Sequence, residues 1–235
     1  MKYSSFSLQN CLFTLLFVLP SGFVSAQSSC SSDGVAPMRS FTERFTAADC
    51  ADCWENPHAV VRLGTDSVVL DWIVPSDSGD EAALSAAAIR DASSRLGELG
   101  MAVAKNQKVR TSFVRSSGGT PLRVAHGLAV NAYIGTSIEL TRHLQTFTPL
   151  TAYLLLVERI PKGTANTPIE RFLVRNMLQE SLTLAALSGK PVLISRRPMS
   201  IPAGVNPDNL GVVGWLQDSK GKILAAVQSR CSTPP

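Results

Sequence analysis

Two cysteines with two residues between them, Cys50 and Cys53, constrain the fold of this chain more than any other feature. They follow residues 38–46, which alternate apolar and polar side chains as a short strand does. They precede residues 53–63, which suit about three turns of helix and end before Gly64. A CxxC between a strand and a helix can be a redox couple, half a zinc site or a structural disulfide.

The first 26 residues have the order of a secretory signal peptide. A positive charge at Lys2 precedes an apolar run over residues 12–19, and small residues lead to a cleavage site after Ala26. Pro20 and Gly22 interrupt the run well before the roughly 20 apolar residues that a membrane anchor needs. We therefore predict a periplasmic or secreted protein, with no transmembrane segment in the mature chain.

Cleavage near Ala26 would remove Cys11 and leave four cysteines in an oxidising compartment, where disulfides persist. If Cys50 pairs with Cys53, the remaining two are Cys30 and Cys231, each in a polar terminal segment. We therefore predict a structural disulfide between Cys30 and Cys231.

The mature chain divides by character into three parts. Residues 27–37 are small and polar and are expected to be a flexible N-terminal segment. Residues 38–135 open as strand, CxxC, helix, buried strand at Ser67–Val74 and a second helix from Asp80 to Gly100. Residues 136–235 are β-rich.

Short strand-like runs fill the chain beyond residue 110. A hairpin is predicted from residues 212–217 to Ile223–Gln228 because Gly221 lies in the intervening turn. Residues 171–178 fit either a strand or a helix. The other strand-like runs are residues 110–115, 121–125, 129–134, 152–157 and 191–195. Strands at this spacing favour a β-sandwich-like second half.

Three segments resemble a secreted thioredoxin-like family of proteobacteria, the domain of unknown function numbered 1223. Residues 43–53 (ERFTAADCADC) resemble its opening E-L-F-T-S-x-x-C-x-x-C strand and turn. Residues 212–226 resemble its closing V-V-x-x-x-Q-D, G-x-I-L-x-A-A hairpin, and residues 152–157 resemble its central strand. The resemblance implies an α+β protein with a thioredoxin-like N-terminal part and a β-rich C-terminal part, and a strand at residues 171–178. The interval before Tyr153 is short, which leaves open whether the thioredoxin-like part is complete. The family has no established activity.

The strand–helix placement assigns a role to each sulfur of the CxxC. Cys50, at the start of the helix, would be the exposed attacking sulfur, and Cys53, one turn further on, would be the more buried resolving sulfur. A thioredoxin-like site also needs a cis-proline loop, for which Thr120 and Pro121 are the candidates. Asp49 and Asp52 flank Cys50 and would raise its pKa, because a nearby negative charge disfavours the thiolate.

The function predicted is that of an exported thiol–disulfide oxidoreductase or redox-linked binding protein, with protein thiols or disulfides as partners. The first alternative is a non-enzymatic structural or interaction module in which the CxxC is a permanent disulfide. The second is a copper-handling thioredoxin relative that uses Cys50, Cys53 and a distant histidine.

Other functions lack support in the sequence. His58 would be only a third zinc ligand, and no second CxxC or HxxxH completes a set, so neither a metal nor a cofactor is expected. His126 and His143 are interpreted as surface or core residues. Trp54 would either cover the sulfurs or simply pack, and packing is the commoner role of a tryptophan. A net charge of +4 without a basic cluster argues against a nucleic-acid partner. Motifs of hydrolases, metalloproteases and nucleotide-binding proteins are absent.

Overall fold

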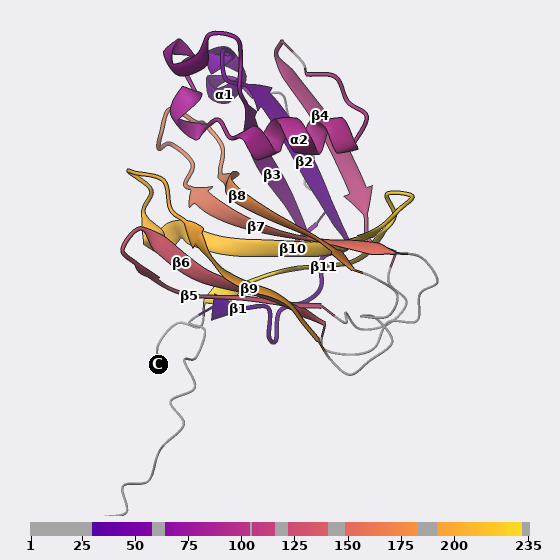
Figure 1. Cartoon of the computed structure of the whole chain (residues 1–235). Helices are drawn as coiled ribbons and strands as arrows, with labels where there is room; N and C mark the ends of the chain where they lie inside the picture. Colours follow the sequence, from indigo (N-terminus) through magenta and orange to yellow (C-terminus); the bar gives the residue numbers. More distant parts are fainter. Residues whose placement is uncertain are drawn as a thin grey trace, which may run out of the picture.

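The computed structural model describes residues 30–57, 64–103, 105–115, 122–140, 149–182 and 192–231, without the side chains of residues 192 and 193. These ranges form two β-sheets that pack face to face, with two short α-helices on the larger one (Figure 1). The predicted signal peptide lies outside the described residues.

The larger sheet has seven strands in the order β11-β10-β7-β8-β3-β2-β4. Two of its pairings, β2 with β3 and β3 with β8, are parallel, and the other pairings are antiparallel. Its strands are β2 (Ser40–Ala47), β3 (Ser67–Val74), β4 (Gln107–Phe113), β7 (Leu150–Ile160), β8 (Arg171–Leu182), β10 (Leu210–Asp218) and β11 (Ile223–Gln228).

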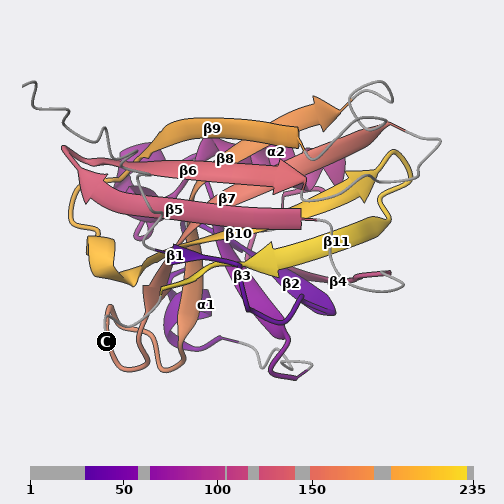
Figure 2. The same ribbon diagram turned by 90° about the horizontal axis from the view of Figure 1, so that it is seen from below.

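The smaller sheet has five antiparallel strands in the order β12-β1-β5-β6-β9 and lies in front of the larger one in Figure 2. Its strands are β1 (Cys30–Ser31), β5 (Leu122–Val130), β6 (Tyr133–Leu140), β9 (Val192–Ser200) and β12 (Arg230–Cys231). Strands from both sides of residue 135 occur in each sheet, so neither sheet belongs to one half of the chain.

The helical elements are α1 (Ala51–Glu55), α2 (Arg90–Glu98) and three 3₁₀ turns, η1 (Gly79–Glu81), η2 (Ser85–Ala87) and η3 (Pro207–Asn209). α2 packs Ala92 and Leu96 onto the face of β2 and β3 that carries Phe41, Phe45 and Trp72. No helix among the described residues is long and apolar enough to cross a bilayer.

The core between the two sheets follows from the period-two alternation of β7. Ala152, Leu154 and Leu156 face the smaller sheet, whereas Tyr153 and Leu155 face the side that α2 covers. Such a strand is apolar on both faces because both faces are buried.

The two sheets lie close together at Gly214 on β10. A Cβ at this position would lie 2.6 Å from Cγ1 of Val124 on β5 and 3.2 Å from the Tyr153 carbonyl oxygen. Only glycine leaves room for this contact.

The β-sandwich expectation is confirmed, but for a sandwich assembled from both halves of the chain. The thioredoxin-like expectation is wrong. The described helices have five and nine residues, and a second sheet, not a helical layer, covers much of the larger sheet. The parallel β2–β3 pair that the CxxC loop connects is local and sits within a mostly antiparallel sheet.

Several individual elements were predicted correctly. β3 and β11 have the expected bounds, the hairpin turn holds Gly221 at φ 79°, and residues 171–178 belong to a strand, β8. The strand expected over residues 129–134 is instead divided between β5 and β6. Asn131 and Ala132 form the turn with φ of 49° and 61°, the conformation that a two-residue hairpin of type I′ requires.

Both predicted helices are shorter than expected. α1 ends with Asn56 as its C-cap because Pro57 follows, and the residue before a proline avoids the α conformation. Residues 58–63 lie outside the described ranges. The helix expected from Asp80 to Gly100 is interrupted where Ala88 forms an extended bridge with Ile73 of β3.

Candidate functional site

The Cys50–Cys53 pair lies in the loop that follows β2, at the carboxyl end of the parallel β2–β3 pair. The Ala48 N–H donates to the Val74 carbonyl over 2.9 Å, and the Cys50 N–H donates to the Ala47 carbonyl over 2.9 Å. These bonds fix the loop to both strands. Ligands commonly bind beyond the carboxyl ends of parallel strands.

The two cysteines form a disulfide and differ in exposure. Cys50 is half-buried, whereas Cys53 is only 7% exposed. The exposure order therefore matches the one predicted for an attacking and a resolving sulfur. Cys50 is the N-cap of α1, which has only five residues, so the macrodipole of this helix contributes little.

Arg171, the first residue of β8, is fully buried beneath α1. Its Nη2 donates to the Trp54 carbonyl over 2.6 Å and to the Cys53 carbonyl over 3.4 Å. Its guanidinium also lies 4.1 Å from the centre of the Trp54 ring, a cation–π distance. Arg171 thus binds carbonyls at the end of α1 that have no partner inside the helix.

Asp71 on β3 joins Arg171 to a second buried arginine, Arg44 on β2. Its Oδ1 accepts from Arg44 Nε over 2.6 Å and from Arg171 Nη1 over 2.8 Å. Its Oδ2 has no hydrogen-bond partner among the described residues. Burial lowers the pKa of Arg171; the Asp71 charge opposes this shift and the Arg44 charge adds to it. We name Arg44 and Arg171, together with the Asp71 that they share, the buried arginine pair.

The buried arginine pair holds two positive charges for one negative charge. Of the two cations, Arg171 is the one that contacts the CxxC backbone, with its Nη2 3.4 Å from the Cys53 carbonyl oxygen. The predicted opposing charges, Asp49 and Asp52, are exposed, so solvent screens them. Arg44 and Arg171 lie on β2 and β8, outside the CxxC loop. The sequence prediction considered only the residues of that loop and therefore did not include these two cations. The signal that could have found them is an arginine within each of two strand-like runs, since a buried arginine needs a partner.

Trp54 anchors α1 from the other direction. Its Nε1 donates to the Ala165 carbonyl over 2.7 Å, and its side chain packs in a small apolar cluster with Ile73 and Leu173. The prediction that Trp54 is a packing residue is confirmed.

A separate ion pair occupies the opposite face of β2. Arg95 on α2 binds Glu43 through Nε at 2.9 Å and Nη2 at 3.0 Å, with both side chains buried. Tyr153 donates to Glu98 over 2.9 Å, and its pKa is raised, mainly by burial. This network attaches α2 to the sheet and does not contact the CxxC.

The predicted disulfide between Cys30 and Cys231 is present and joins β1 to β12, with a Cα–Cα distance of 3.9 Å. Two disulfides fit an oxidising compartment. Thr120 and Pro121, the candidate cis-proline loop, lie outside the described residues, as do His58 and His143. Within the described ranges, the potential metal ligands that lie together are Cys30, His126 and Cys231, and this group includes neither Cys50 nor Cys53.

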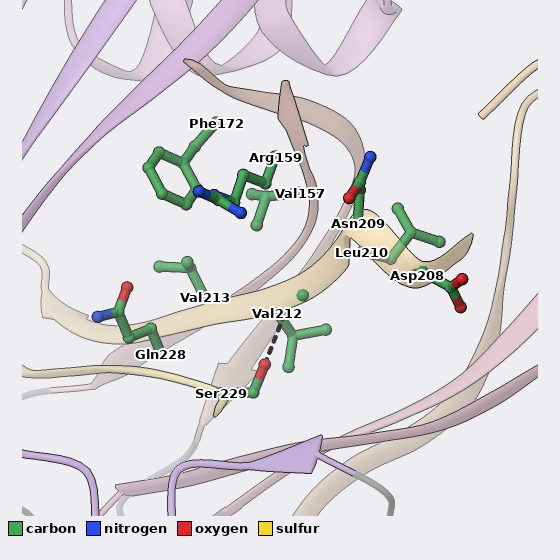
Figure 3. Close-up of a pocket in the computed structure, with 11 residues that line it drawn as sticks. Val157, Arg159, Phe172, Asp208, Asn209, Leu210, Val212, Val213, Gln228 and Ser229 are labelled. Carbon is green, nitrogen blue, oxygen red and sulfur yellow. Dashed lines mark hydrogen bonds between the residues drawn. The ribbon is translucent and has the colours of Figure 1, made fainter. Parts of the chain in front are cut away.

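A cavity of about 170 Å³ opens between β7, β8, β10 and η3 (Figure 3). Arg159, which binds Glu170 over 2.7 Å, lines one side, and the Ser229 hydroxyl accepts from the Val212 N–H on another. The volume is below the roughly 300–1,000 Å³ of typical small-molecule sites. We therefore place the candidate chemistry at the CxxC.

Comparisons with known proteins do not assign the chain to a family. No family model and no curated protein matches it. Among solved structures, it is similar to an endonuclease/exonuclease/phosphatase from Beutenbergia cavernae (12% identity, TM-score 0.28), over 52% of this chain and 30% of that one. It is also similar to chicken MD-1 complexed with lipid IVa (12% identity, TM-score 0.23), over 48% of this chain and 91% of that one. Superpositions this poor support no inference about fold or function.

Proposed function

We propose that this chain is an exported thiol–disulfide oxidoreductase that exchanges disulfides with protein thiols through Cys50 and Cys53. The observation that carries the proposal is the exposure difference within the CxxC, because exchange needs one sulfur that a partner can reach. The signal-peptide pattern of residues 1–26 supports export to the periplasm or beyond.

In the reaction, a partner's thiolate attacks Cys50 Sγ, and the Cys50–Cys53 bond breaks to release the Cys53 thiolate. A second thiol of the partner then attacks the mixed disulfide and frees Cys50. The partner leaves oxidised by two electrons, and Cys50 and Cys53 become thiols by taking up the two thiol protons. The Cys53 thiolate is the leaving group, and Arg171 Nη2 donates to the carbonyl of the same residue over 3.4 Å.

The resemblance to the secreted family numbered 1223 supports the same site. The three segments of this chain that resemble the family are β2 with the CxxC loop, β7, and the β10–β11 hairpin. All three belong to the seven-stranded sheet that holds the CxxC.

A second candidate function is that of a non-enzymatic module with a permanent Cys50–Cys53 disulfide. The bonds from Arg171 to the Trp54 carbonyl and from Trp54 to the Ala165 carbonyl favour it, because they hold α1 in place from two sides. A rigid loop is an expected property of a structural staple.

The reduction potential of the Cys50–Cys53 pair separates the two functions. We expect a value between roughly −120 and −270 mV, the range of known oxidoreductases, whereas a value below about −300 mV would identify a staple. A Cys30→Ser/Cys231→Ser variant reports this pair alone.

Trapping in cells gives an independent test. A Cys53→Ser variant should accumulate mixed disulfides through Cys50, and a Cys50→Ser variant should accumulate far fewer. If both variants fold and neither captures a partner, the oxidoreductase proposal is wrong.

A further inference from the structure

Three metal-ligating side chains meet in the smaller sheet, away from the CxxC. Cys30 on β1 pairs with Cys231 of β12 on one side and with His126 of β5 on the other. One ligating atom from each residue lies within 4.8 Å of the others. The strand order β12-β1-β5 brings these residues together, and Figure 2 shows β1 beside β5.

His126 has the hydrogen bonding of a histidine prepared to bind a metal. Its side chain is buried, with 5% of the residue exposed, and its Nδ1 lies 3.0 Å from the Gly127 carbonyl oxygen. A carbonyl oxygen can only accept, so Nδ1 carries the proton and Nε2 keeps its lone pair. Metal-binding histidines commonly donate their other ring N–H to a backbone carbonyl in this way.

The Nε2 atom of His126 has no hydrogen-bond partner among the described residues. A buried polar atom without a partner is uncommon and calls for an explanation. Burial also lowers the pKa of His126, which keeps the imidazole in the neutral form that binds metals. A ring nitrogen of His126 lies within 4.8 Å of both sulfurs of the Cys30–Cys231 disulfide.

We propose that reduction of the Cys30–Cys231 disulfide opens a zinc site made of the Cys30 and Cys231 thiolates and His126 Nε2. A dithiol reductant supplies two electrons and two protons, which convert the disulfide into two thiols, and leaves as its own disulfide. Binding of Zn²⁺ then releases the two thiol protons. This site is independent of the oxidoreductase function proposed for Cys50 and Cys53.

The dimensions of the cluster suit zinc. Zn–S bonds of about 2.3 Å and Zn–N bonds of about 2.0–2.1 Å place tetrahedral ligands roughly 3.5–3.8 Å apart. The ligating atoms already lie within 4.8 Å of one another, so modest side-chain rotations suffice. Cys231 is exposed, which gives the ion access and leaves the fourth position to water. Thiolate and imidazole ligands together favour zinc over magnesium or calcium.

Cobalt is the probe for this site, since Co²⁺ occupies zinc sites and its absorption reports thiolate ligands. The full chain carries the substitutions Cys11→Ser, Cys50→Ser and Cys53→Ser, so that Cys30 and Cys231 are its remaining thiols. After reduction with a phosphine and removal of oxygen, we expect one Co²⁺ per chain, a thiolate-to-cobalt charge-transfer band, and its displacement by Zn²⁺. The oxidised protein should show no such band.

His126→Gln is the matched variant, and its affinity for Zn²⁺ should fall by roughly tenfold or more. Circular dichroism of both proteins in the oxidised form checks that the variant folds. If it does not fold, X-ray absorption at the zinc edge of the unmodified site should still show two sulfurs and at least one imidazole. An absent charge-transfer band, a spectrum without imidazole, or equal zinc affinity in a folded His126→Gln variant would each overturn the proposal.

Discussion

Arg171 donates from Nη1 to Asp71 Oδ1 over 2.8 Å, although 100 residues separate the two in the sequence. The parallel pairing of β8 with β3, which aligns Leu70 with Phe172 and Asp71 with Leu173, brings them together. The same arginine binds the backbone of α1, so one side chain connects the CxxC loop to the middle of the sheet.

Replacement of Arg171 should destabilise the protein strongly. Arg171→Met leaves the Trp54 carbonyl without its donor and removes one of the two cations that bind Asp71. Asp71 keeps its pair with Arg44, so we expect the unfolding free energy to fall by roughly 1–3 kcal/mol, the usual cost of leaving a buried hydrogen-bonding group without its partner. Urea unfolding measures the change. Arg159→Met is the control, because its pair with Glu170 is largely exposed and should contribute no more than about 1 kcal/mol. Similar losses in the two variants would contradict the role given to Arg171.

A side chain at position 214 should push the two sheets apart. Gly214→Ala introduces a Cβ within 2.6 Å of Val124 Cγ1, and overpacking of this kind costs roughly 1–3 kcal/mol. Gly135→Ala on β6 is the matched control, since its Cβ would meet no atom within 4 Å. Thermal unfolding of both variants tests the prediction, which fails if the control loses as much stability as Gly214→Ala.

The two disulfides should contribute unequally to stability. Cys30 and Cys231 close a loop over 201 residues, whereas Cys50 and Cys53 are three residues apart. In the chain-entropy model, these loops correspond to about 5 and about 2 kcal/mol. Unfolding of the Cys30→Ser/Cys231→Ser and Cys50→Ser/Cys53→Ser variants should show this order. The reverse order would mean that the CxxC disulfide holds structure well beyond its own loop.

Stability should decline below neutral pH because of His126. Its folded-state pKa is lowered, chiefly by burial, so the unfolded chain binds more protons once the pH falls below about 6.5. The stabilising contribution is therefore complete above that pH and is lost progressively as the pH falls toward the folded-state pKa. Urea midpoints at pH 7.5 and 5.5 should differ less in His126→Gln than in the unmodified protein. An equal difference would show that other groups cause the pH dependence.

Local sequence patterns predicted the strands well, because a strand buried on one face alternates apolar and polar residues and a strand buried on both faces is continuously apolar. Ser67–Val74 is continuously apolar except for Ser67 and Asp71, and it forms β3 with the expected bounds. The helix limits were missed where one residue decides the outcome: Pro57 ends α1, and Ala88 pairs with β3 instead of continuing a helix.

The arrangement of the strands was harder to predict than the strands themselves. A strand, a CxxC and a following parallel strand resemble the start of a thioredoxin domain. The residues around the CxxC, however, do not show that β8 pairs with β3. For the same reason, Asp49 and Asp52 were identified as the charges around the CxxC, while Arg44 and Arg171 were not. The Cys30–Cys231 pairing was predictable because counting cysteines does not depend on knowing the fold.

The pairing of β1 with β12 also limits when the protein can finish folding. Cys30 and Cys231 face each other across 201 residues, so this edge of the smaller sheet cannot form until almost the whole described chain has been synthesised. Contacts between such distant residues slow folding, because the chain loses much loop entropy before they form.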